Sequence, residues 1–274
     1  VVAHFGTLDV PAFCAVAGVA EDDVRAVARR IARAASVSIF EDLGIQQAPN
    51  STLCSYLEKL VYLLTGHFAQ RGSMNIHTRL ARLSGGGSGG GDRRSPVTGQ
   101  RIITGLIPAA AIPDEILTDH PRRFRAMIVE SANPAHSLPD SPRMREALDA
   151  LECLVVIDVA LTETARRAHY VLPAPSQYEK WEAAFFTLEF PRNTFQLRAP
   201  VLPPLPGTLA EPEVHRRLVR ALGAYTDADL VPLHEAAALG REAFAMAFLG
   251  TLSARPELTP YAALLLYETL GPTL

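Results

Sequence analysis

Several polar side chains with nucleotide-binding chemistry follow two apolar runs in the middle of this sequence. These residues are Glu130, Ser131, Asn133, His136, Asp158, Thr162 and Glu163. Carboxylates accept hydrogen bonds from a ribose or a guanine base, and the N–H groups of a helix N-terminus bind a pyrophosphate. The same residue types also form turns and helix caps, so the pattern by itself leaves both roles open.

Three short apolar runs, at 126–129, 154–157 and 170–172, are typical of strands buried on both faces. Ser141 and Pro142 are expected to start an amphipathic helix between the first two runs, and Thr162 to cap a short helix before the third. The positions that we expect to be almost wholly buried are Leu57, Ile128, Leu148, Val155, Val156 and Val171. This alternation predicts an α/β fold with a doubly wound, mainly parallel sheet, Rossmann-like and three-layered.

The carboxyl ends of parallel strands meet at one edge of such a sheet, and ligands bind there. The polar residues that follow the first strand, at 130–136, and those that follow the second, at 158–163, fall at that edge. No serine stands in a G-x-S-x-G motif and no two histidines have the spacing of metal ligands. We therefore predict no catalytic residue and no metal ligand in this chain, but a nucleotide-type binding edge.

The N-terminal part predicts a further strand and polar loop of the same kind. A helix is expected from Glu21, followed by a strand at 36–40 and then a helix that starts at Asn50 or Ser51 and ends at Gly66. The loop between the strand and the second helix contains Gly44, Gln46 and Gln47. These three residues are candidates for a second binding loop.

Glycine and serine fill residues 84–91, which predicts a flexible linker of either natural or engineered origin. A proline-rich spacer spans 200–212, and helices are expected at about 212–223, 232–248 and 258–269. The predicted domains are thus a Rossmann-like domain at 1–205 and a helical C-terminal extension at 206–274.

Composition excludes several classes of protein. The net charge of −3 gives no reason to expect nucleic acid or a membrane surface as a partner. The three cysteines are far apart, and no signal peptide or membrane-spanning run is visible. We expect a reducing, cytoplasmic compartment. Because the sequence starts at Val1 instead of methionine, a removed N-terminal segment is left open.

Three stretches together resemble a known family. They are FEDLGIQQ…LVYLLTGHFAQRGSMN (40–75), IVESANPAHS (128–137) and VVIDVALTETARRAHYVLPAPSQYEK (155–180). In this order they are similar to the molybdopterin oxidoreductases of the dimethyl sulfoxide reductase and formate dehydrogenase type. Members of that family bind molybdenum or tungsten between two pterin guanine dinucleotides, and many carry an N-terminal iron–sulfur cluster of the 4Fe–4S type.

The resemblance implies a role for each candidate residue. Ser131, Asn133 and His136 would lie near the dinucleotide, with Glu130 beside them. Asp158 would bind the guanine or ribose, and Thr162 and Glu163 would lie at the following helix N-terminus. Gly44, Gln46 and Gln47 would lie nearer the pterin.

The sequence also departs from the family pattern. It contains no four-cysteine cluster motif, no upstream residue to ligate the metal and no C-terminal β-barrel domain. At Ala168-His169-Tyr170 the family often has Ala-Asp-Val, so an acidic residue is replaced there.

Three functions follow as hypotheses. The first is one cofactor-binding domain or fragment of a molybdenum or tungsten oxidoreductase, not catalytic alone, whose partners are the remaining domains of the enzyme and an electron-transfer protein. The second is a structural or electron-transfer-complex subunit that keeps the fold without molybdenum. The third, an unrelated NAD or nucleotide-sugar domain, is disfavoured because no G-x-G-x-x-G follows a predicted strand.

Overall fold

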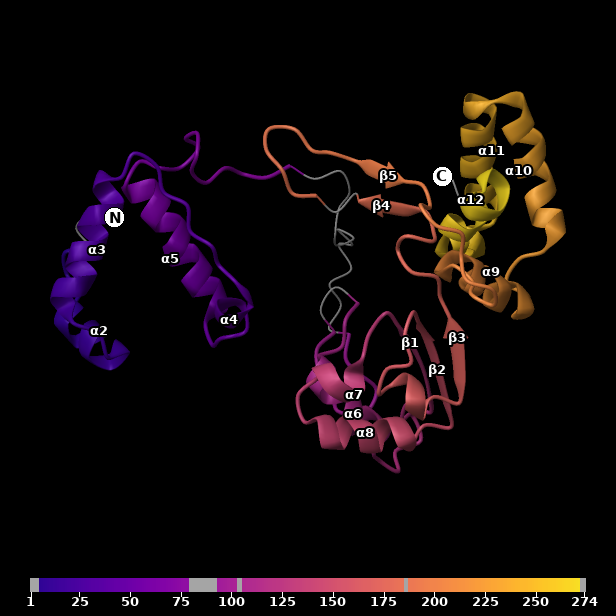
Figure 1. Cartoon of the computed structure of the whole chain (residues 1–274), viewed down its shortest axis with the longest axis horizontal. Coiled ribbons are helices and arrows are strands. Elements are labelled where there is room, and N and C mark those ends of the chain that lie inside the picture. The colour runs from indigo at the N-terminus through magenta and orange to yellow at the C-terminus, as the bar shows by residue number, and fades with distance from the viewer. Residues whose placement is uncertain (1–4, 79–92, 103–104, 185–186, 272–274) are drawn as a thin grey trace. The chain divides into compact units, whose positions relative to one another are not determined.

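The computed structural model describes residues 5–78, 93–102, 105–184 and 187–271 (Figure 1). The chain divides into two units, Val1–Leu80 with Phe186–Thr194, and Ala81–Phe185 with Phe195–Leu274. The predicted linker at 84–91 lies outside the described residues, and the predicted domain boundary near residue 205 stays a prediction.

The second unit contains the predicted parallel sheet. Its strands are β1 (Ala126–Glu130), β2 (Cys153–Asp158) and β3 (Tyr170–Pro173), in the order β1-β2-β3. Both pairings are parallel, with Ile128 opposite Val155 and Val155 opposite Tyr170. The prediction of an α/β fold with parallel strands is therefore confirmed.

One face of this sheet is covered by three helices, α6 (Ile112–Ile116), α7 (Pro134–Ser137) and α8 (Ser141–Asp149) (Figure 1). Leu154 and Val156 of the central strand pack there against Met144 and Leu148, and all four side chains are fully buried. Burial of such side chains contributes roughly 1.5–3 kcal/mol each, so this face forms the core of the unit.

The other face of the sheet is covered only near the carboxyl ends of the strands. There Ile157 packs against Val214 of α9 (Glu211–Ala221), with Leu172 alongside. Ile128 is 56% exposed and Val171 is 36% exposed. The prediction that these two residues are buried was wrong, because the described residues bring no helix over the rest of that face.

The helix α8 begins one residue earlier than the sequence suggested. Its cap is Asp140, whose carboxylate accepts a hydrogen bond from the backbone N–H of Arg143 at 3.2 Å. Ser141, the predicted cap, instead donates its hydroxyl hydrogen to the carbonyl oxygen of Leu138 at 3.1 Å. The cap of the short helix η2 (Ala165–Arg167) is Thr164, whereas Thr162, the predicted cap, lies two residues earlier and accepts from the N–H of Ala165 at 3.2 Å.

The C-terminal part forms the predicted helical extension. After α9 come α10 (Asp227–Leu239), α11 (Arg241–Ala254), η3 (Pro256–Tyr261) and α12 (Ala262–Leu270). The single helix predicted at 232–248 is two helices, because Gly240 has a φ of 117° that interrupts helical backbone. Leu233, Leu258 and Leu265 are fully buried in the core that these helices share.

A short antiparallel ribbon lies between the sheet and these helices in sequence. It pairs β4 (Glu182–Ala184) with β5 (Gln196–Arg198).

The first unit contains α2 (Val10–Ala17), α3 (Glu21–Arg33), α4 (Leu43–Gln46) and α5 (Ser51–Leu64). The helices predicted from Glu21 and from Ser51 are both present. Leu57 of α5 is 47% exposed, so its predicted burial was wrong within this unit. The apolar stripe of α3 likewise remains exposed, with no buried residue.

The strand predicted at 36–40 is not formed in the described chain. Its backbone groups are satisfied by side chains instead: the phenol oxygen of Tyr62 accepts from the N–H of Ile39 at 2.6 Å, and Ser73 donates to the carbonyl oxygen of Val37 at 2.7 Å. Tyr62 is itself buried. These contacts hold the segment against the end of α5 without a neighbouring strand.

The two faces of the sheet allow a direct stability test. Val156→Asp places an unpaired carboxylate in the core and should cost more than about 3 kcal/mol, enough to abolish soluble expression. Ile128→Asp places the same group on the exposed face and should leave the urea midpoint of the chain nearly unchanged. A soluble, fully folded Val156→Asp variant would contradict the packing described here.

A second prediction concerns the acid stability of α9. Hydrogen bonds from Arg216 lower the pKa of Glu213 from 4.5 to about 2, and Arg217 adds to this effect. A carboxyl group with a depressed pKa stabilises the fold above its ordinary pKa of 4.5, and that stability is lost as the pH falls towards 2.

Glu213→Gln should therefore lower the free energy of unfolding by about 2 kcal/mol at neutral pH. Its difference from the wild type should shrink as the pH falls through this window, as measured by denaturant unfolding at a series of pH values. Glu146→Gln, on the exposed face of α8, is the matched control. A Glu213→Gln difference that stays constant down to acid pH would contradict the assignment.

Candidate functional site

A cavity of about 530 Å³ lies at the carboxyl edge of the parallel sheet. The segments after β1, β2 and β3 line it, through Ser131, Asp158 and Gln177 among others, and Glu211 at the start of α9 completes it. Three chain segments that are distant in sequence thus meet where the strand pattern places a ligand site.

Ser131 turns the chain sharply at the end of β1. Its φ of 51° is in the left-handed region, which costs a non-glycine residue energy, and its N–H donates to the carbonyl oxygen of Ile157 at 3.0 Å. The bond continues the ladder between β1 and β2 by one residue. It also holds Ser131 beside the end of the central strand.

Asp158 is the last residue of β2 and faces the same cavity. Its Oδ1 atom accepts hydrogen bonds from the backbone N–H groups of Val159 at 2.7 Å and Ala160 at 3.4 Å. No hydrogen bond from the described part of the chain reaches its Oδ2 atom. One carboxylate oxygen is therefore fixed by the turn while the other keeps its capacity to accept.

Asn133, Glu163 and Thr164 form a connected group between the loops after β1 and β2. The side-chain oxygen of Asn133 accepts from the hydroxyl of Thr164 at 2.8 Å and from its N–H at 3.2 Å. The amide of Asn133 donates to Glu163 at 2.6 Å, and this bond lowers the pKa of Glu163. Asn133 also lines the cavity, whereas Thr164 is fully buried and is not among the lining residues.

Glu130 and His136 occupy the rim of this edge. Glu130, at the end of β1, contacts the Nε2 atom of His215 in α9 at 2.5 Å. His136 is exposed on α7, and its charge contributes to the lowered pKa of Glu163. Thr162 lies before η2, where its hydroxyl oxygen accepts from the N–H of Ala165, so all seven residues predicted on this sheet lie on segments that follow β1 or β2 or at the ends of these strands.

The loop after β3 supplies lining residues that the sequence analysis did not include among the site residues. Ser176, Gln177, Tyr178, Lys180 and Glu182 line the cavity. Lys180 pairs with Glu211 at 2.5 Å, and both side chains are mostly buried. The sequence pattern does indicate these residues, because it predicts β3 as a third parallel strand, and the loop after such a strand must begin at the same edge of the sheet.

The remaining predicted residues, Gly44, Gln46 and Gln47, belong to the other unit. Gly44 and Gln46 lie in α4, and Gln47 is its C-terminal cap. Asp42 caps the start of this short helix by accepting from the N–H of Leu43 at 2.7 Å. Their role as a second binding loop stays a prediction.

His169, where similar proteins often have an aspartate, has a structural partner. Its Nδ1 atom accepts a hydrogen bond from the N–H of Leu154 at 2.9 Å. Leu154 is near the amino end of β2, so this contact lies away from the cavity. His169 is not among the residues that line the cavity.

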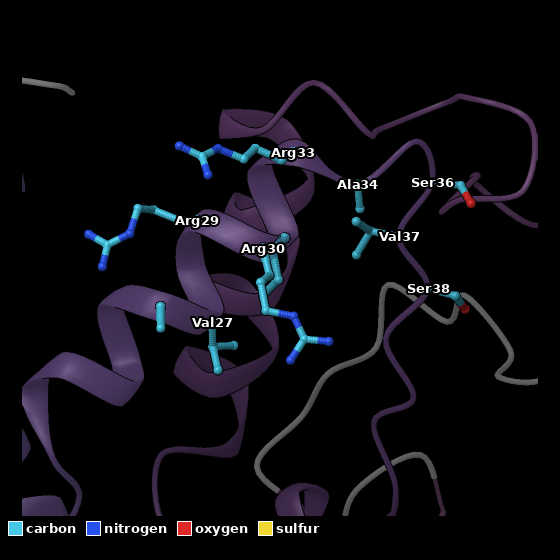
Figure 2. A pocket seen from close by; sticks show the side chains of 10 residues that line it. Val27, Arg29, Arg30, Arg33, Ala34, Ser36, Val37 and Ser38 are labelled. Carbon is cyan, nitrogen blue, oxygen red and sulfur yellow. The ribbon is translucent and has the colours of Figure 1, made fainter.

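A larger and more open cavity, of about 820 Å³, lies in the first unit between α3 and residues 36–38. Its walls include Arg29, Arg30 and Arg33. Figure 2 shows Arg29 and Arg33 extending to one side of the helix and Arg30 to the other. Because these guanidinium groups do not converge, the cavity lacks the common focus of an anion site.

Comparison with known proteins agrees with the edge geometry. The profile of the family described as molybdopterin oxidoreductase matches residues 46–204, more than half of the chain. The chain belongs to this family. The matched region of this molybdopterin oxidoreductase chain contains all three parallel strands and every residue that lines the cavity at their carboxyl ends except Glu211.

Individual relatives of this family member cover shorter stretches. The probable oxidoreductase YoaE of Bacillus subtilis (strain 168) is 34% identical over 114 residues, 41% of this chain and 16% of that protein. Trimethylamine-N-oxide reductase of Vibrio vulnificus (strain YJ016) is 40% identical over 57 residues, 21% of this chain and 7% of that protein.

The F420-dependent formate dehydrogenase subunit alpha of Methanocaldococcus jannaschii is 36% identical over 90 residues, 33% of this chain and 13% of that protein. This molybdopterin oxidoreductase chain thus covers only 7–16% of the length of these three relatives.

Family membership implies a molybdopterin cofactor with molybdenum or tungsten. Within the described residues, no group of three or more His, Cys, Asp or Glu side chains is placed to hold a metal ion. The edge residues instead offer hydrogen-bonding groups to a ligand, because Asp158 keeps one accepting oxygen and Ser131 has a hydroxyl. Among the described helices, none has both the length and the apolar character needed to cross a membrane.

The left-handed turn at Ser131 generates a prediction. Ser131→Val introduces a β-branched residue at a φ of 51° and should lower the free energy of unfolding by about 1–2 kcal/mol. Ser131→Gly accepts this conformation and should unfold at or above the wild-type temperature. The comparison is made by thermal denaturation, and equal stability of the two variants would contradict the turn geometry.

Proposed function

We propose that this chain binds the guanine nucleotide end of a pterin guanine dinucleotide within a molybdenum or tungsten oxidoreductase. The observation that carries the proposal is the position of Asp158 at the carboxyl end of the central strand, where it lines a cavity of about 530 Å³ and has one carboxylate oxygen fixed by the turn. Cavities of roughly 300–1,000 Å³ are the usual size for small-molecule sites.

Guanine matches the chemistry of Asp158. Its N1 and 2-amino groups are adjacent donors, and a carboxylate accepts from both at once in a charge-assisted pair. Adenine has no such pair of donors on that edge. The bonds from Val159 and Ala160 to Oδ1 orient the carboxylate before the base arrives.

Other residues of the cavity would complete the nucleotide contacts. The exposed ring of Tyr178, with the guanidinium of Arg198 5.7 Å from its centre, offers a flat surface for the base. The hydroxyls of Ser131 and Ser176 would bind the ribose or diphosphate, and Lys180 supplies a positive charge near three carboxylates, Asp158, Glu182 and Glu211.

The reaction itself belongs to the cofactor. When bound, the molybdenum or tungsten pterin supplies two-electron chemistry, while the residues here bind and orient its nucleotide end. Gly44, Gln46 and Gln47 would lie nearer the pterin, as the family resemblance implies. The partners we propose are the remaining domains of the same enzyme and an electron-transfer protein, in the cytoplasm.

Asp158→Asn tests this function because the amide keeps the shape of the side chain but loses the charge and one acceptor. In the 274-residue chain, isothermal titration should show binding of GDP, weaker binding of inosine diphosphate, which lacks the 2-amino group, and weaker still of ADP. The variant should bind GDP about 10–100-fold more weakly, with its melting temperature unchanged.

Asp149→Asn is the matched control, since Asp149 pairs with Arg167 at the end of α8, away from the cavity. It should bind GDP as the wild type does. Equal affinity of the wild type for GDP and ADP, or an unaffected Asp158→Asn variant, would leave Asp158 as a turn residue only. Molybdenum and pterin content of the protein purified from its natural source would then distinguish a cofactor domain from a subunit that keeps the fold without the metal.

A further inference from the structure

A buried hydroxyl makes two of the hydrogen bonds that join two loops of the binding edge. Thr164, after β2, has no exposed surface. Its Oγ1 atom donates to the side-chain oxygen of Asn133 at 2.8 Å and accepts from the N–H of Ala135 at 3.1 Å. Both partners lie in the segment after β1, so one side chain joins the two segments that flank the cavity.

The hydrogen-bonding capacity of Asn133 is nearly exhausted by this arrangement. Its side-chain oxygen has two lone pairs, and they accept from the hydroxyl and the N–H of Thr164. One of its two amide hydrogens is donated to Glu163. Although Asn133 lines the cavity, its oxygen has no capacity left to accept from a ligand.

The two joined segments carry Ser131 and Asp158, the residues that we propose contact the nucleotide. Ser131 is two residues before Asn133, and its left-handed turn is held from the other side by the carbonyl oxygen of Ile157. Asp158 follows Ile157, at the start of the segment that ends in Thr164. A shift of either loop would change the separation of Ser131 and Asp158.

We infer that Thr164, acting through Asn133, is a positioning residue that sets the spacing between Ser131 and Asp158 in the nucleotide site. The ligand in this inference rests on the proposed function, whereas the contact between the two loops does not depend on it. Thr164 touches no part of the cavity directly. Its hydroxyl acts by holding the two loops in the spacing that a guanine nucleotide requires.

Thr164→Val tests the inference because valine has the same shape and lacks the hydroxyl. In the 274-residue chain, GDP should bind about ten-fold more weakly to this variant, as expected for the loss of a buried hydrogen-bond group. Thr164→Ser retains the hydroxyl and should restore affinity to within about two-fold of the wild type. Asn133→Ala removes the other partner of the hydrogen bond and should weaken GDP binding as much as Thr164→Val does. With two such variants, the test can still be made if one of them does not fold.

Leu148→Ala separates positioning from simple loss of stability. Leu148 is fully buried in the same core but lies in α8, away from both loops. It should lower the melting temperature at least as much as Thr164→Val while GDP affinity stays within about two-fold of the wild type. If Leu148→Ala weakens GDP binding equally, or if Thr164→Val does not weaken it, the inference is overturned.

Amide hydrogen exchange tests the loop contact without any ligand. Thr164→Val should speed exchange at Ala135 and throughout 131–136 and 158–165, relative to Leu148→Ala. If the wild type fails to bind GDP, the proposed function fails, and the exchange result alone decides the inference. Unchanged exchange in both loops would overturn it, and faster exchange in both would support it.

Discussion

The parallel pairing of β1, β2 and β3 is the constraint on which the binding edge depends. Because the three strands run in the same direction, the segments that follow them leave the sheet at one edge, and their polar residues converge there. Leu154 and Val156 anchor the central strand by full burial against α8. Burial of this face of β2 thus fixes the position of Asp158, the last residue of the strand.

Charged and polar contacts then fix the segments beyond the sheet. Glu130 contacts His215 of α9, and Lys180 pairs with Glu211 of the same helix. Val214, which lies between Glu211 and His215 in the sequence, packs against Ile157. The start of α9 is therefore attached to the edge by two polar contacts and one apolar contact. The C-terminal helices are connected to the binding edge through this helix and its neighbours.

Much of the fold could be predicted from local sequence pattern. The β-branched runs gave the three strands, and the spacing of Met144, Ala147 and Leu148 gave α8, because both patterns depend on residues close together in the chain. The position of Asp158, Ser131 and Asn133 at one edge followed from parallel topology alone. The family resemblance covers this same region.

The wrong predictions concern residues whose burial or backbone conformation depends on contacts with residues distant in the sequence. Ile128 and Val156 are alike in sequence, and only the placement of helices shows that one is exposed and the other buried. Residues 36–40 have strand composition, but Tyr62 and Ser73 bind their backbone instead. Gly240 divides an alanine-rich run that otherwise resembles one helix, and the loop after β3 supplies lining residues through contacts with α9.

A crystal structure of the 274-residue chain with GDP is the most direct test of the central claim. We expect the guanine base at the carboxyl edge of the sheet, with its N1 and 2-amino groups within hydrogen-bond distance of Asp158 and its ribose near Ser131. Nucleotide bound in the arginine-lined cavity beside α3, with the edge cavity filled only by water, would contradict the assignment.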